Sequence, residues 1–225
     1  MIKQARHIEA LEESTTTQAG SSVIRNPPET KRSLQGTDRF HLRVAEGWIG
    51  VGDYEAASQQ LDKISPELRT HAEVLNVQWR ICVNAKDWDA VLDIASTLVL
   101  LDPQDSLGRT HLSFALHELK RTSEARDNLL RVVDTFPDNA TMRYNLACYE
   151  CQLGRMEEAK GWLAAAFKLG GKRQMTRAAL SDTDLEPLRE WLETGSPSRK
   201  VSHCDGVARL PDTAPITRRA EMVAA

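Results

Sequence analysis

Apolar residues between positions 38 and 171 recur with a period of 34 residues. When this stretch is written in rows of 34 that begin at Asp38, Ala72, Ser106 and Ala140, residues of the same class align without an insertion. The second half of each row carries a small residue and then apolar residues four and seven positions later: Ala57, Leu61 and Ile64; Val91, Ala95 and Leu98; Ala125, Leu129 and Val132; Ala159, Leu163 and Ala166. This spacing places the three side chains on one face of an α-helix. Each row is therefore predicted to contain a helix that is buried on that face.

The first half of each row predicts another helix, and a short turn follows it. Its apolar positions are clear in the third and fourth rows, at Leu112 and Leu146, whereas the second row departs from the pattern at Gln78. The turns carry residues that end one helix and cap the next. They are Gly52-Asp53-Tyr54, Lys86-Asp87-Trp88, Lys120-Arg121-Thr122 and Gly154-Arg155-Met156. The pattern as a whole predicts an all-α chain of helix-turn-helix units.

The segment before the periodic stretch has a different composition. Residues 14–37 are rich in Ser, Thr, Gly and Pro and lack apolar periodicity, which is typical of a linker. Ahead of them, Ile2–Glu13 predicts a short amphipathic helix with Ile8 and Leu11 on one side. A helix this short is marginal in water unless it docks onto something. Residues 1–37 are thus expected to form a short helix and a flexible linker.

The segment after the periodic stretch is expected to protect its last unit. A stripe of apolar residues between positions 172 and 194 comprises Leu185, Leu188, Trp191 and Leu192. It predicts a C-terminal capping helix, with Ser181 or Asp182 at its start, because an uncapped stack of repeats exposes apolar side chains to water. Residues 195–225 return to a linker-like composition and predict a flexible tail.

The period and the fourth row resemble the tetratricopeptide repeat. That row reads Tyr144-Asn145-Leu146-Ala147 and then Leu153-Gly154-Arg155-Met156-Glu157-Glu158-Ala159, with the Leu-Gly pair and the alanine of the family pattern. The resemblance implies a right-handed superhelical solenoid of four 34-residue helix-turn-helix repeats, at 38–71, 72–105, 106–139 and 140–171. The capping helix would complete it.

In this family, function lies on the concave surface, which the first helices of the repeats form. The resemblance therefore implies a non-catalytic protein-protein interaction module, an adaptor or scaffold that binds a peptide or partner helix in its groove. Groove positions in the second to fourth rows give the predicted partner-binding residues: Asn76, Arg80, Val83, Leu107, Thr110, Phe114, His117, Tyr144 and Cys148. The groove becomes more apolar toward its last end. An alternative is that the chain's own N- or C-terminal tail covers this apolar patch.

A chaperone for a secreted or assembling protein is a second interpretation, because such a protein would use an apolar groove. An adaptor for the acidic tails of heat-shock chaperones is disfavoured. Family members that form that clamp carry a lysine and an arginine in the third of its repeats. This chain offers Leu107 and His111 there in one phase, or Thr141 and Asn145 in the other.

Charge and hydropathy narrow the class of partner. The net charge is −3 and the pI is about 6.1, whereas a nucleic-acid or anionic-membrane binder normally carries a basic excess. No apolar run approaches the roughly 18 residues of a membrane span, and the first residues lead into acidic ones instead of an apolar signal core. We therefore expect a cytoplasmic protein whose partners are proteins or peptides, with no nucleic acid and no membrane. The sequence leaves the oligomeric state open.

Cys148 and Cys151 raise the possibility of metal or thiol chemistry, because they lie about one helical turn apart and face the helix that carries His111 and His117. These histidines are six residues apart and so point about 120° away from each other. The thiols also lie inside a helix, away from the N-terminus that would lower their pKa. A metal- or thiol-dependent protein is thus the less favoured alternative, and no cofactor is expected. The chain also lacks phosphate-loop and nucleophile-elbow motifs, so no catalytic residue is predicted.

Overall fold

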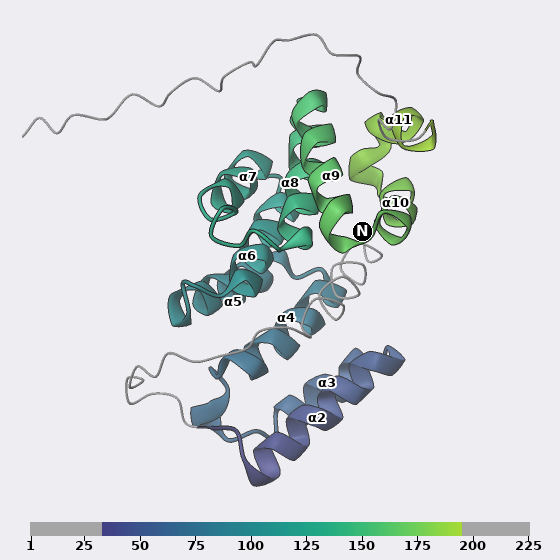
Figure 1. Cartoon of the computed structure of the whole chain (residues 1–225). Coiled ribbons are helices and arrows are strands. Elements are labelled where there is room, and N and C mark those ends of the chain that lie inside the picture. Colours follow the sequence, from purple (N-terminus) through teal and green to yellow (C-terminus); the bar gives the residue numbers. More distant parts are fainter. Residues whose placement is uncertain (1–32, 195–225) are drawn as a thin grey trace, which may run out of the picture.

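The computed structural model describes residues 33–194, and every regular element in that range is a helix. Four helix pairs follow one another: α2 (Gly36–Val51) with α3 (Tyr54–Leu61), α4 (Ala72–Ala85) with α5 (Trp88–Leu101), α6 (Ser106–Glu118) with α7 (Thr122–Leu130), and α8 (Ala140–Gln152) with α9 (Met156–Gly170). A short 3-10 helix, η1 (Pro66–Leu68), connects the first two pairs. The pairs stack in chain order from α2 to α9 (Figure 1). Among the described residues, no helix combines the length and apolar character of a membrane span.

The turn inside each helix pair has the same backbone conformation. Gly52, Lys86, Lys120 and Gly154 lie 34 residues apart and have φ angles of 87°, 59°, 64° and 78°. This left-handed conformation ends a helix and suits glycine, which has no Cβ to clash with the backbone. The second and third turns adopt it with lysine, at a cost in conformational energy. The period seen in the sequence is therefore repeated in the backbone angles.

Side-chain caps start several of the helices. Asp53 and Asp87 accept hydrogen bonds from the backbone N–H of Ala56 and Ala90, at 2.9 and 3.2 Å. Asp105 caps α6 and Asn139 caps α8 in the same way. Each cap satisfies backbone donors that the first turn of a helix cannot pair internally. Among the second helices, α3 and α5 thus begin at a capped residue, whereas α7 and α9 begin without a side-chain cap.

The small residues of the 34-residue pattern lie at the closest contacts between helices. Ala57, Val91, Ala125 and Ala159 are all fully buried, as the sequence pattern predicts. The apolar core around them has three parts, formed by the first pair, by α4 to α6, and by the third and fourth pairs with the C-terminal segment. α4 belongs to two of these parts, because Val74 and Val77 join the first and Leu75 and Trp79 join the second. Gln78, at an apolar position of the pattern, is exposed.

The C-terminal segment covers the last pair, but it does so in three short pieces instead of one helix. They are α10 (Lys172–Leu180), the 3-10 helix η2 (Thr183–Leu188) and α11 (Arg189–Glu193). Asp182 accepts a hydrogen bond from the backbone N–H of Asp184 and so starts η2. Pro187 lies inside η2 and has no N–H to donate, which disfavours a continuous α-helix. Leu185, Leu188 and Leu192 are buried against the pair, whereas Trp191 is half-buried. The expected helix Ile2–Glu13, the linker and the tail 195–225 lie outside the described residues.

Candidate functional site

The first helices of successive pairs lie next to one another. Arg39 of α2 and Glu73 of α4 occupy the same row position, 34 residues apart, and form a two-pronged ion pair with Nη2 and Oε1 3.2 Å apart. Between α4 and α6, the rings of Trp79 and His111 stack with their centroids 3.7 Å apart. We call the nine predicted groove residues the inner face. They lie on α4, α6 and α8.

The part of the inner face on α4 and at the start of α6 retains exposed surface. Asn76, Arg80 and Leu107 are half-buried there. The Oδ1 atom of Asn76 is buried without a hydrogen-bond partner among the described residues. Burial, together with the nearby positive charge of Arg80, lowers the pKa of His111 to about 3. His111 is therefore a neutral ring at physiological pH, and the charge of this region comes from Arg80.

The middle of the inner face is packed into the core. The ring of Phe114 makes edge-to-face contacts with Trp79 and Trp88, with centroids 5.7 and 6.0 Å apart. Val83 is buried in the same cluster. Thr110 is also buried, and its hydroxyl donates a hydrogen bond to the carbonyl oxygen of Ser106 at 2.8 Å. These three predicted residues thus offer little surface to a partner in this conformation.

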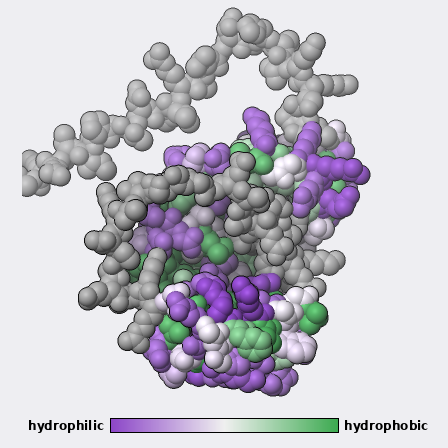
Figure 2. Space-filling view, turned by 60° about the horizontal axis from the view of Figure 1, so that its bottom comes forward, coloured by the Kyte–Doolittle hydropathy of each residue, from purple (hydrophilic) through white to green (hydrophobic). Residues whose placement is uncertain are grey.

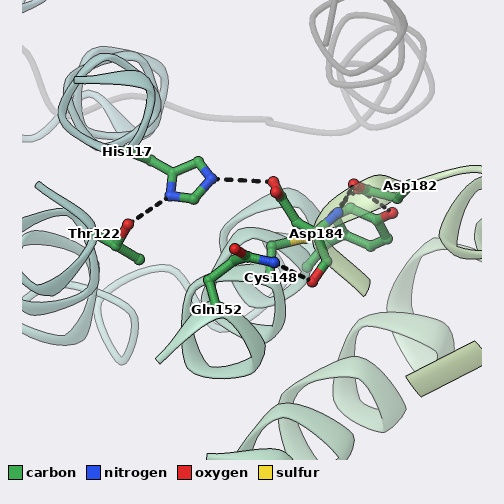
Figure 3. Close-up of polar contacts among 7 residues, drawn as sticks. His117, Thr122, Cys148, Gln152, Asp182 and Asp184 are labelled. Atoms are coloured by element: carbon green, nitrogen blue, oxygen red, sulfur yellow. Dashed lines mark hydrogen bonds and ion pairs between the residues drawn. The ribbon is translucent and has the colours of Figure 1, made fainter. Parts of the chain in front are cut away.

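The last part of the inner face is closed by the chain itself. Asp182, which starts η2, accepts a hydrogen bond from the hydroxyl of Tyr144 at 2.8 Å (Figure 3). The thiol of Cys148, one turn further along α8, is 3.7 Å from the same carboxylate oxygen. Both side chains and the carboxylate are buried. Burial is the main cause that raises the pKa of Tyr144 well above its ordinary value, so the phenol stays protonated and donates.

A second group of contacts fixes η2 to α6 and α8. The ring of His117 lies between two oxygen atoms, with Nε2 3.1 Å from Asp184 and Nδ1 3.0 Å from the hydroxyl of Thr122. Gln152 of α8 donates a hydrogen bond to the backbone oxygen of Asp184 at 2.9 Å. These contacts join α6, the start of α7, α8 and η2 (Figure 3). His117, Tyr144 and Cys148 therefore hold the C-terminal segment in place.

A segment of the chain itself, Asp182–Leu188, covers this end of the inner face. It belongs to neither of the tails expected as occupants, and those tails lie outside the described residues. Sequence reasoning gave Asp182 only the role of a helix cap and did not identify Asp184. A signal was present nonetheless, because Tyr144 and Cys148 place a hydroxyl and a thiol one helical turn apart, and buried donors require an acceptor.

Cys148 and Cys151 are unsuited to thiolate chemistry. Burial, then the neighbouring Asp182, raises the pKa of Cys148 well above its ordinary value, and burial raises the pKa of Cys151 to about 11. Protonated thiols are poor nucleophiles and poor metal ligands. His111 stacks on Trp79 whereas His117 contacts Asp184, so the two histidines lie in different environments. Within residues 33–194, no three His, Cys, Asp or Glu side chains gather as a metal site would require.

Comparison with known proteins identifies the fold. No family model and no curated protein matches the sequence. Among solved structures, the chain is similar to MamA 41-end from Desulfovibrio magneticus RS-1, with a TM-score of 0.56 and 15% identity over 72% of this chain and 94% of that one. It is also similar to TTC0263, a thermophilic TPR protein in Thermus thermophilus, with a TM-score of 0.53 and 18% identity over 70% of this chain and 95% of that one. A further MamA crystal structure gives 0.54 and 16% identity over 70% and 87% of the two chains. The chain therefore has the tetratricopeptide-repeat fold.

Proposed function

We propose that this chain is a non-catalytic interaction module that binds an extended peptide segment of a partner protein between α4 and α6. The observation that supports this position is the uneven accessibility of the inner face. Asn76, Arg80 and Leu107 remain half-buried, whereas Phe114 and Tyr144 are occupied by the chain's own residues. The proposed surface is thus the first part of the predicted groove.

The side chains of this surface suit a peptide. Asn76 carries an amide that can hydrogen-bond a peptide backbone. Its Oδ1 is buried without a donor among the described residues, so turning the side chain toward a peptide gives up no hydrogen bond at that oxygen. Arg80 supplies a fixed positive charge and planar donors for a carbonyl or carboxylate group. Leu107, on the next first helix, supplies apolar contact. A peptide that combines backbone amides, an acidic group and an apolar side chain would match all three.

A site-specific crosslinking experiment tests this proposal. A photoreactive amino acid replaces Leu107 in the full chain, and the same amino acid replaces the outward Leu100, which is 81% exposed, as the positional control. We expect partner peptides at position 107 that are absent at position 100. Each peptide identified by mass spectrometry is then synthesised and titrated against the protein by calorimetry.

Two matched variants sharpen the result. Asn76→Ala combined with Arg80→Ala should weaken binding of the synthesised peptide at least tenfold, or about 1.4 kcal/mol. Arg131→Ala removes an exposed arginine just after α7 and should leave the affinity unchanged. Equal affinity in all three proteins, with thermal unfolding unchanged, would show that the peptide binds elsewhere.

A further inference from the structure

The outer face of α2 carries an exposed apolar stripe. Phe40, Trp48 and Val51 are 61%, 41% and 75% exposed, and Val44 between them is half-buried. At about 100° per residue these four side chains fall within a sector of about 80° on the helix. We call them the α2 stripe. Apolar groups interrupt the polar surface at this end of the molecule (Figure 2).

Later helix pairs bury the positions equivalent to Phe40 and, in the third and fourth pairs, those equivalent to Trp48. The third row position is Phe40 in α2, but Val74 and Met142 at that position are 2% and 0% exposed. The eleventh position is Trp48 in α2, whereas Leu116 is 7% exposed. α4, α6 and α8 bury these residues because the second helix of the preceding pair, α3, α5 or α7, packs on them. Within residues 33–194, α2 has no preceding helix, so its stripe is a place where one further helix fits.

The stripe also has the spacing of a helix-helix seam. Phe40, Val44, Gly47 and Val51 are separated by four, three and four residues, which is the a/d spacing of two packed helices. Gly47 is exposed, and a Cβ added to it would meet no atom within 4 Å. Gly47 thus leaves open space at its place in the seam. A glycine in a seam does allow a second helix to approach closely.

We propose that the α2 stripe binds the α2 stripe of a second copy of this chain, with the two helices antiparallel about a two-fold axis. One register satisfies the whole seam. It places Phe40 opposite the partner subunit's Val51 and Val44 opposite the partner subunit's Gly47, because both pairs sum to the same residue number. Large side chains then face smaller ones along the seam, as well-packed interfaces require. Trp48 flanks the seam and covers it from one side.

The exposed area indicates a weak dimer. Phe40, Trp48 and Val51 each leave about 100 Å² uncovered, so the two copies together would bury about 600 Å² from these side chains. Stable interfaces bury about 1,200–2,000 Å², and smaller ones belong to transient associations. We therefore expect a dissociation constant on the order of 100 μM.

A second copy fits the stripe better than the chain's own first residues. In the helix predicted for Ile2–Glu13, the apolar residues Ile2, Ala5, Ile8 and Leu11 lie three apart, so each is turned about 60° from the one before. Together they spread over about 180°, which does not match a stripe that falls within about 80°. α2 is a formed helix of 16 residues with a matching seam. The chain's own segment remains a distinct outcome of the experiment below.

Analytical ultracentrifugation of the full chain from about 1 μM to 1 mM tests the proposal. We expect the mass to rise from that of a monomer toward that of a dimer, and Trp48→Glu to abolish the rise. Gly47→Gln should weaken association at least tenfold, although it raises the thermal midpoint by improving helix propensity. Gly50→Gln is the matched control, because Gly50 is also exposed, with open space around it, but lies about 120° from the centre of the stripe. It should raise the thermal midpoint and leave association within about twofold.

Three results would overturn the proposal. The first is a wild-type chain that stays monomeric at all concentrations. The second is a dimer that responds equally to Gly47→Gln and Gly50→Gln or that survives Trp48→Glu. The third is a wild-type monomer that dimerises only when Ile8→Glu and Leu11→Glu are introduced, because the chain's own first segment would then be covering the stripe.

Discussion

Removing Arg126 should destabilise the protein far more than replacing its partner, Glu150. The carboxylate of Glu150 is almost fully buried on α8, with a side chain 2% exposed, and its Oε1 lies 2.6 Å from Nε of Arg126 on α7. Arg155 is a weaker second partner at 3.5 Å and is 47% exposed. Arg126→Ala would leave a buried charge with only this distant partner. Breaking a buried pair from one side costs about 3–5 kcal/mol, and the remaining Arg155 places the cost near 3 kcal/mol.

Glu150→Met should cost less than about 1 kcal/mol, because it replaces the buried charge with an apolar side chain of similar volume. The equivalent position in the preceding pair is the buried Leu116, so the site tolerates apolar packing. Arg126 would remain 22% exposed and 2.9 Å from Asp127, which keeps its charge solvated and paired.

Urea unfolding, followed by circular dichroism, gives the unfolding free energy of both variants, and thermal unfolding gives their midpoints. At about 2–4 °C per kcal/mol, Arg126→Ala should lower the thermal midpoint by about 6–12 °C. Arg121→Ala is the control, because Arg121 precedes α7 and its ion pair with Glu124 at 2.7 Å is exposed and should contribute little. Equal losses for Arg126→Ala and Glu150→Met would refute the asymmetry on which the reasoning rests.

Three further predictions concern the second, third and fourth helix pairs. The pKa of His111 is about 3 in the folded chain and about 6.5 in the unfolded chain, so between these values the unfolded chain binds one more proton. The contribution of His111 to the unfolding free energy is therefore complete above pH 6.5 and is lost as the pH falls toward 3. At pH 5 the loss is about 2 kcal/mol, and His111→Phe, which keeps the stacking on Trp79, should remove that part of the pH dependence in urea titrations. Lys86→Gly should raise the unfolding free energy by up to about 1 kcal/mol, because it relieves the positive φ of 59°, and a lower value would argue against strain there. Cys148 and Cys151 should resist alkylation at pH 8 until the chain is unfolded in guanidinium, as followed by peptide mapping, and rapid labelling of the folded protein would contradict their raised pKa.

The helix pairs could be predicted from the sequence because their determinants are local and repeat. Each determinant acts within a few residues: the small residue Ala57 and its equivalents, helix-ending residues such as Gly52, and caps such as Asp53. Each of these patterns is weak alone, but its recurrence every 34 residues makes it recognisable. Lys86 shows the limit of this approach, since its left-handed backbone is evident only from its alignment with Gly52. The position in the row therefore carries more information than the residue itself.

The closed end of the inner face could not be predicted, because it depends on contacts between distant residues. Asp182 meets Tyr144 across 38 residues, and Asp184 meets His117 across 67. No local pattern indicates that the chain turns back after α10 and lays a 3-10 helix on α8. The burial of Glu150 was not predicted either, although the residue at the same position of the preceding row, Leu116, is apolar and buried.

The energy that holds η2 in place decides which part of the inner face a partner can use. Releasing η2 would expose Leu185 and Leu188, which are 0% and 2% exposed, and each buried leucine contributes about 1.5–3 kcal/mol. The hydrogen bonds of Asp182 and Asp184 would be exchanged for bonds to water, so the apolar burial alone gives about 3–6 kcal/mol. The open form would then be about one molecule in 10² to one in 10⁴, and a ligand for Tyr144 and Cys148 would lose the same factor in apparent affinity. A peptide on Asn76 and Leu107 does not have to displace η2. Because η2 competes with a partner for Tyr144 and Cys148, the surface of α4 and α6 is the favoured place for a partner to bind.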